Sequence, residues 1–149
     1  MTILDQVQGE LHAAMKSGQR GRLNALRLML SALQRAEKDR PAGEFTDQDA
    51  QAVLRRERKQ RIEAAEAYRA AGNDERAEAE EADVPVIDEF LPQQLSGEEL
   101  ASLVDQAIAE TGAASMRDMG KVMGLVTQRS QGRADGRAAS DMVKARLSA

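Results

Sequence analysis

Apolar residues recur every three or four positions along most of this chain, which is the spacing of one face of an α-helix. Ile3, Val7, Leu11 and Met15 form the first such stripe. The residues between the stripes are mainly Ala, Glu, Arg and Gln, which favour helices, and β-branched residues are sparse. The 149 residues include two Phe, one Tyr and no Trp, so the core has to be aliphatic. The sequence therefore predicts an all-α protein.

Capping signals divide this pattern into seven predicted helices joined by short loops. A hydroxyl residue followed three positions later by an acid has the spacing of a capping box, in which each side chain bonds a free amide at the start of the helix. Thr2 supplies a simple N-cap for the first helix. Capping boxes are predicted at Thr46 with Asp49, Ser96 with Glu99, and Ser115 with Asp118.

Proline and glycine predict where several helices end. Pro85 lies inside an apolar pattern, so we expect a break there, or a new helix capped by Asp83. Gly132 is expected to end the helix that begins at Ser115, because glycine adopts positive φ without strain. Asp135 then caps the last helix.

The stretch LPQQLSGEEL, residues 91–100, indicates a domain boundary. Pro92 terminates one helix, and Ser96 begins the next. We predict an N-terminal bundle of about four helices over residues 1–92, followed by a small three-helix domain over residues 93–149. The short loops favour antiparallel neighbours in both.

Several classes of chemistry are excluded or disfavoured by residue content. The chain has no Cys and a single His, His12, which excludes thiolate nucleophiles and argues against a metal site. We recognise no catalytic residues and expect no cofactor. The N-terminus lacks the apolar core of a signal peptide, and no apolar run approaches the length of a membrane span. The sequence predicts a cytoplasmic protein with no membrane partner.

Charge is distributed unevenly along an acidic chain with a net charge of −4. Residues 1–92 hold 14 basic and 18 acidic residues, whereas residues 117–149 hold seven basic and three acidic ones. The basic run RRERKQR, residues 55–61, is expected to be a solvated helix face paired in part with Glu57 and Glu63. It would also pair with the acidic run from Asp74 to Asp83 if the two helices are antiparallel.

The stretch GKVMGLVTQRSQGRADGR, residues 120–137, combines glycine with basic residues. It lacks the spacing of a phosphate loop, and no strand precedes it. Gly120 and Gly124 share a helix face, where they permit close approach either of a neighbouring helix, the reading we favour, or of an RNA backbone. Arg129, Arg133 and Arg137 surround the predicted turn, where clustered cations beside a helix N-terminus can contact phosphates; solvated surface arginines are the alternative.

Three segments carry a resemblance to the GatB/YqeY family: DEFLPQQLSGEEL (88–100), SMRDMGKVMG (115–124) and GRADGRAASDMV (132–143). Residues 53–81 resemble the preceding region of stand-alone YqeY-like proteins. The resemblance implies a two-part helical fold whose C-terminal part is similar to the tail domain of the B subunit of glutamine-dependent tRNA amidotransferases. That tail is understood to contact the body of the tRNA, while other domains perform the chemistry. The resemblance implies that Lys121, Arg133 and Arg137 are the matching positions, framed by Gly120, Gly124, Gly132 and Asp135. With Arg129 and Lys144, these three cations are the predicted nucleic-acid-binding residues.

The resemblance leads to one expectation and two alternatives. We expect an accessory protein that binds tRNA through its C-terminal helices and has no active site of its own, because the kinase-like ATP domain of those enzymes is missing from this sequence. The first alternative is an adaptor that docks on an amidotransferase or an aminoacyl-tRNA synthetase. The second is a component of a carbon–nitrogen ligase with glutamine as amido-N-donor.

Overall fold

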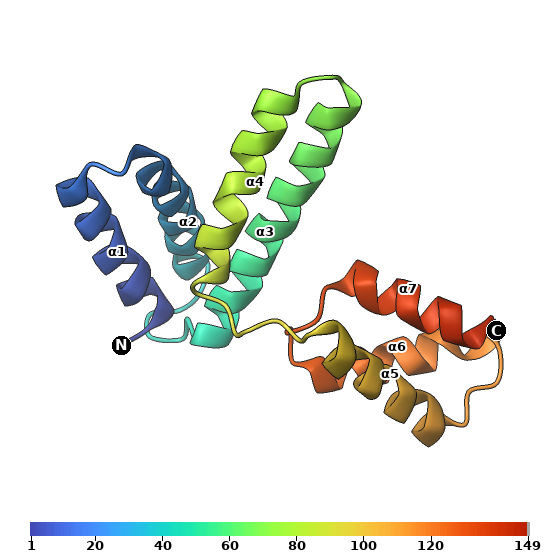
Figure 1. Cartoon of the computed structure of the whole chain (residues 1–149). Coiled ribbons are helices and arrows are strands. Elements are labelled where there is room, and N and C mark those ends of the chain that lie inside the picture. Colours follow the sequence, from blue (N-terminus) through green and yellow to red (C-terminus); the bar gives the residue numbers. More distant parts are fainter. Residues whose placement is uncertain (149) are drawn as a thin grey trace. The chain divides into compact units, whose positions relative to one another are not determined.

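The computed structural model describes residues 1–148, and their secondary structure is helical throughout, which confirms the predicted all-α class (Figure 1). Two compact units are present, one from Met1 to Leu91 and one from Pro92 onward. Unit 1 contains α1 (Ile3–Ser17), α2 (Arg20–Lys38), α3 (Asp47–Ala70) and α4 (Asp74–Asp88), and unit 2 contains α5 (Gly97–Thr111), a 3-10 turn (Met116–Asp118), α6 (Met119–Ser130) and α7 (Gly136–Leu147).

The core of unit 1 is aliphatic and forms where α2 packs against α1, α3 and α4. Leu26, Leu33 and Leu54 are fully buried in it. Met15 does not join this core as predicted, since it is 52% exposed and Ala14 is buried instead. A four-residue spacing turns by about 40° per step around a helix of 3.6 residues per turn, so a stripe begun at Ile3 has rotated off the core by Met15.

Capping boxes define the starts of α1 and α3, and a separate hydrogen bond links these two helix starts. Thr2 caps α1, with Asp5 completing a box that the sequence analysis had not assigned, and the predicted box of Thr46 with Asp49 caps α3. The Ile3 amide also donates to Asp47 Oδ1 at 3.0 Å. A free amide at the start of α1 is thus satisfied by the first residue of α3.

The α3–α4 hairpin is held together by small residues and ion pairs beyond the core. Ala65 and Ala77 are the buried residues of its distal half, which extends past α1 and α2 (Figure 1). Arg61 contacts both Glu80 and Asp83, and Arg69 donates two hydrogen bonds to Glu81. The predicted pairing of the basic run with the acidic run is confirmed.

The predicted break at Pro85 is wrong, because α4 continues through it to Asp88. A proline inside a helix removes one backbone hydrogen bond and crowds the carbonyl four residues earlier, here that of Glu81. Both residues are exposed, so water can solvate the carbonyl that loses its partner. Ile87, which is 1% exposed, and Phe90 anchor the end of this segment in the core.

Unit 2 is a three-helix unit with its own aliphatic core, in which each of α5, α6 and α7 contacts the other two. Val104, Val122 and Val143 are fully buried, one from each helix. The predicted capping box of Ser96 with Glu99 starts α5, and Asp135 caps α7 by accepting a bond from the Ala138 amide.

The start of α6 differs from the prediction. Ser115 caps the 3-10 turn and not α6, and the predicted box with Asp118 does not form. Instead, Asp118 Oδ2 accepts from the amide of Ala114 at 3.0 Å. A tighter 3-10 turn often precedes an α-helix when the chain has to change direction at that point.

Candidate nucleic-acid interface

The turn between α6 and α7 is built from two consecutive residues with positive φ. Gly132, with φ 77°, behaves as predicted, but Gln131, with φ 51°, is the residue that caps α6. A left-handed conformation is uncommon for a residue with a side chain. The turn is held from outside, because the Leu95 amide donates to the carbonyl of Arg133 at 2.7 Å.

Arg133 has a structural contact in addition to its predicted role. Its Nε donates to the carbonyl of Gln93 at 2.8 Å, alongside the Leu95 bond to the Arg133 carbonyl. The residue therefore fastens the segment before α5 to the α6–α7 turn. Its role in RNA binding stays a prediction, and substituting it would disturb this junction as well as remove a charge.

Arg129 is paired with an acid from a different helix. Its guanidinium donates to Glu110 at the end of α5, and this bond lowers the pKa of the Glu110 carboxyl. Arg146 makes a similar bond to Asp105 of α5 at 2.5 Å. The acids of α5 thus neutralise part of the basic C-terminal segment, and residues 92–149 together contain seven basic and seven acidic residues.

The other three predicted cations are exposed on α6 and α7. Lys121 lies in the first turn of α6, where its charge helps to lower the pKa of Asp118, although the hydrogen bond from Ala114 contributes most. Arg137 and Lys144 lie seven residues apart on α7 and therefore share a face of that helix. Lys121, Arg137 and Lys144 are thus exposed on α6 and α7, whereas Arg129 and Arg133 bond to other residues of unit 2.

Gly120 and Gly124 do not contact a neighbouring helix, so that expectation is wrong. Both are exposed, and a Cβ built on either would meet no atom within 4 Å in the described structure. The packing of α6 uses Val122 and Val126 instead. The face with the glycines is therefore open to an approaching molecule.

Three further polar residues border this open face and were not among the predicted site residues. Thr127 and Gln128 are exposed on the solvent side of α6, and Arg117 is exposed in the preceding 3-10 turn. Helical projection from Gly120 and Gly124 would have placed Thr127 and Gln128 beside them. We call the set Gly120, Lys121, Gly124, Thr127 and Gln128 the open α6 face.

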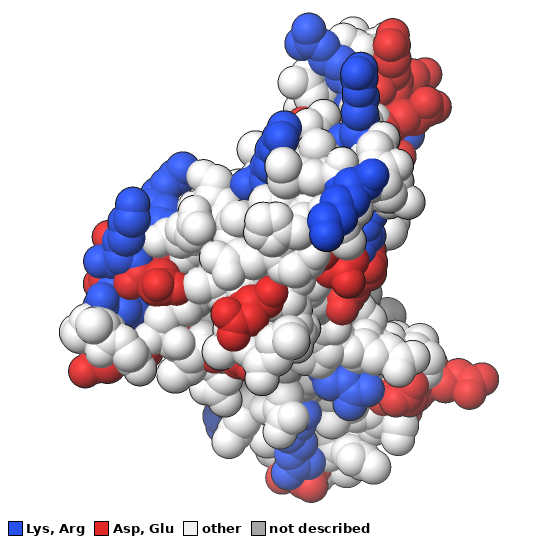
Figure 2. Space-filling model, turned by 90° about the vertical axis from the view of Figure 1, so that its left-hand side faces the viewer, with Lys and Arg blue, Asp and Glu red and all other residues white. Residues whose placement is uncertain are grey.

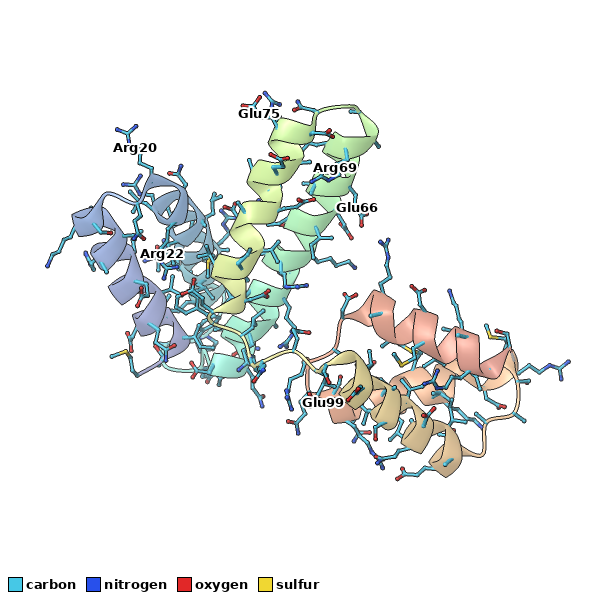
Figure 3. All side chains as sticks on the ribbon, in the orientation of Figure 1. Arg20, Arg22, Glu66, Arg69, Glu75 and Glu99 are labelled. Carbon is cyan, nitrogen blue, oxygen red and sulfur yellow. The ribbon has the colours of Figure 1, made fainter. Side chains whose placement is uncertain are left out.

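An apolar groove of about 370 Å³ lies elsewhere, between α3 and α4 in unit 1. Ile62, Ala65 and Val84 line it, together with the ion pair of Arg69 and Glu81. Arg69 is labelled in Figure 3. The pair lowers the pKa of Glu81. Each charge in this pair is compensated by the other.

The described residues contain no group of three His, Asp or Glu side chains that could hold a metal ion. No helix among them combines the length and apolar character needed to cross a membrane.

The two helical units define an all-α protein whose second unit carries the open α6 face. The family model for YqeY-like proteins matches residues 4–147, and the chain belongs to this family. No curated protein matches the sequence significantly.

Proposed function

We propose that this YqeY-like protein binds tRNA and that the open α6 face of unit 2 is a contact surface. The proposal is supported by family membership together with the resemblance of unit 2 to the tail domain of the amidotransferase B subunit. Lys121, Arg137 and Lys144 are exposed and are the predicted site cations that would meet phosphates.

One observation carries the proposal, namely two glycines within a helix that no part of the described structure approaches. Glycine in a helix costs about 1 kcal/mol relative to alanine. Neither Gly120 nor Gly124 takes a positive φ, so neither backbone conformation nor internal packing requires glycine there. Gly9 and Gly21 are also open helical glycines, but Gly120 and Gly124 form a pair on one helix face. A ligand backbone can lie close to α6 at this pair, and Lys121 is placed beside it to meet a phosphate.

The aromatic content and charge of unit 2 determine which features of an RNA it can recognise. All three aromatic residues, Phe45, Tyr68 and Phe90, belong to unit 1, so unit 2 has no aromatic ring to stack on exposed bases. Recognition through this unit would rely on the shape of the RNA and on phosphate contacts. Because this recognition depends on phosphate contacts, we expect tRNA binding to weaken steeply as the salt concentration rises.

Substituting the two glycines tests the proposal. We expect Gly120→Ala combined with Gly124→Ala to stabilise unit 2 by about 1 to 2 kcal/mol, from helix propensity. The same variant should bind tRNA at least about tenfold more weakly in a filter or fluorescence titration, since two methyl groups block the approach. Gly9→Ala is the matched control, because Gly9 is also exposed within a helix and has nothing within 4 Å.

Unchanged tRNA affinity in the stabilised double variant would remove the α6 face from the proposal. A chain that binds no tRNA at 50 mM salt would refute the function itself. Lys121→Gln with Lys144→Gln should reduce the slope of log affinity against log salt by about 2, one phosphate contact for each lysine.

A second candidate, an adaptor that docks on an amidotransferase or synthetase, draws support from the neutral charge of unit 2. A neutral surface with bare glycines also suits a partner helix. Pull-down with purified protein after nuclease treatment separates the two candidates. A protein partner that remains bound, and is lost in the double glycine variant, would favour the adaptor.

A further inference from the structure

A row of cations follows the solvent side of α2 in unit 1. Arg20, Arg27 and Lys38 differ by seven and eleven residues, which places them within about 20° of one another around the helix, and Arg35 lies about 60° to one side. All four are exposed. They lie opposite the buried residues Leu26, Met29 and Leu33, and we call them the α2 stripe.

The stripe has no acidic partner within the described structure. None of its four side chains makes an ion pair or a side-chain hydrogen bond. Arg22 of the same helix behaves differently, because it turns inward and binds Glu10 and Glu89. Figure 3 shows Arg20 projecting away from the helices into open space.

The absence of pairing is unusual for this unit. Residues 1–92 contain more acids than bases, and the basic side chains of α3 mostly contact acids, as Arg58 does with Asp88 at 2.7 Å. The single acid of α2, Glu37, lies about 100° from the stripe. Four positive charges therefore remain uncompensated on one face of an acidic unit.

The dimensions and chemistry of the stripe fit a polyanion that runs along the helix. Eighteen residues separate Arg20 from Lys38, or about 27 Å at the rise of an α-helix. Asn24, Ser31 and Gln34 lie between the cations and are exposed, and such neutral side chains commonly donate to phosphate oxygens. Figure 2 looks onto the side of the molecule that carries α1 and α2, where Lys and Arg side chains stand out among acidic ones.

We propose that the α2 stripe is a second RNA-contacting surface, along which a phosphate backbone lies. This inference rests on the proposed function, and it assigns to unit 1 a share of the binding that the family resemblance placed in unit 2. A membrane surface fits less well, because α2 directs its apolar side at α1, α3 and α4 and exposes only Leu28 among its large apolar residues.

The test compares the intact chain with two charge-matched variants in tRNA titrations at several salt concentrations. The stripe variant is Arg20→Gln, Arg27→Gln and Arg35→Gln, and glutamine preserves helix propensity. The control is Arg56→Gln, Lys59→Gln and Arg76→Gln, three exposed cations of α3 and α4. Both variants change the net charge by −3, so a general effect of charge would weaken them equally.

We expect the stripe variant to lose about 10- to 100-fold in affinity at 0.1 M salt and to reduce the salt slope by about 2 to 3, whereas the control loses less than about threefold. Equal losses in the two variants, or a stripe variant that binds like the intact chain, would overturn the inference.

The two sets of variants distinguish a failure of the α2 stripe from a failure of the proposed function. If the lysine variant of unit 2 weakens binding and the stripe variant does not, the stripe is refuted and the proposed function stands. If only the stripe variant weakens binding, the stripe is supported and the α6 face is refuted. Binding to phosphatidylserine vesicles but not to tRNA would overturn both.

Discussion

Arg61 is the residue of the α3–α4 hairpin whose loss should matter most. Its guanidinium contacts Glu57 Oε2 at 3.3 Å, Glu80 Oε2 at 3.6 Å and Asp83 Oδ2 at 3.7 Å. All four side chains are between 18% and 24% exposed. One cation therefore compensates three partly buried carboxylates, and Glu80 Oε2 has no hydrogen-bond partner besides this ion pair.

We expect Arg61→Gln to destabilise unit 1 by about 3 kcal/mol. Each contact should contribute about 1 kcal/mol, the upper end for exposed pairs and well below the loss seen when a fully buried pair is broken. For a unit of about 90 residues this corresponds to a decrease in Tm of about 12 to 24 °C. Thermal unfolding followed by circular dichroism measures it, and Arg56→Gln, an exposed and unpaired neighbour, should change stability by less than about 0.5 kcal/mol.

The stability lost in Arg61→Gln, which we call the deficit, should become smaller as the pH falls. Burial already raises the pKa of Asp83, and Arg61 opposes that effect. Without Arg61 the folded-state pKa rises further above the unfolded value, so the folded state takes up protons more readily and the deficit shrinks as pH falls from 7 to 5. A loss below about 1 kcal/mol, or an equal deficit at both pH values, would refute this account of the hairpin.

Three further variants test the N-cap of α5, the core of unit 1 and the ion pair of Arg129 with Glu110. Ser96→Ala removes a capping-box hydroxyl and should cost unit 2 about 1 kcal/mol by thermal unfolding, while the core of unit 1 keeps its stability. Leu26→Ala, at a fully buried position, should destabilise unit 1 by about 2 to 5 kcal/mol, and a loss below 1 kcal/mol would contradict the assigned core. Glu110→Gln should raise tRNA affinity about two- to threefold by releasing Arg129. The pKa of Glu110 is lowered in the folded state, so the pair with Arg129 stabilises the fold above the unfolded-state pKa of Glu110. This stabilisation is lost as the pH falls through the folded-state pKa. Acid titration of Glu110→Gln should lack this pH-dependent loss.

The helices and most of their boundaries could be predicted from sequence because they depend on local chemistry. Thr46 and Ser96 cap helices through bonds to amides only three residues away, and Gly112 ends α5 by its own φ of 67°. Predictions failed where packing over longer distances decided the outcome. Pro85 stays inside α4 because the residues after it, Ile87 and Phe90, are anchored in a core assembled from other helices.

The candidate site shows the same division. The sequence identified the basic residues, the glycines on one face of α6 and the family resemblance, because these follow from residue type and spacing. It could not show that Arg129 pairs with Glu110 or that Arg133 binds the carbonyl of Gln93, since those partners are 19 and 40 residues away.

The sequence by itself determined the helical class, most of the capping residues and the family, all of which depend on residue type and near-neighbour spacing. Only the tertiary structure decided which charges remain uncompensated. It placed acids of α5 beside Arg129 and Arg146, and it turned Arg22 inward between two carboxylates. Among the described residues it left the α2 stripe without an acidic partner. Electrostatic compensation depends on distance in space, which the order of residues along a chain does not fix.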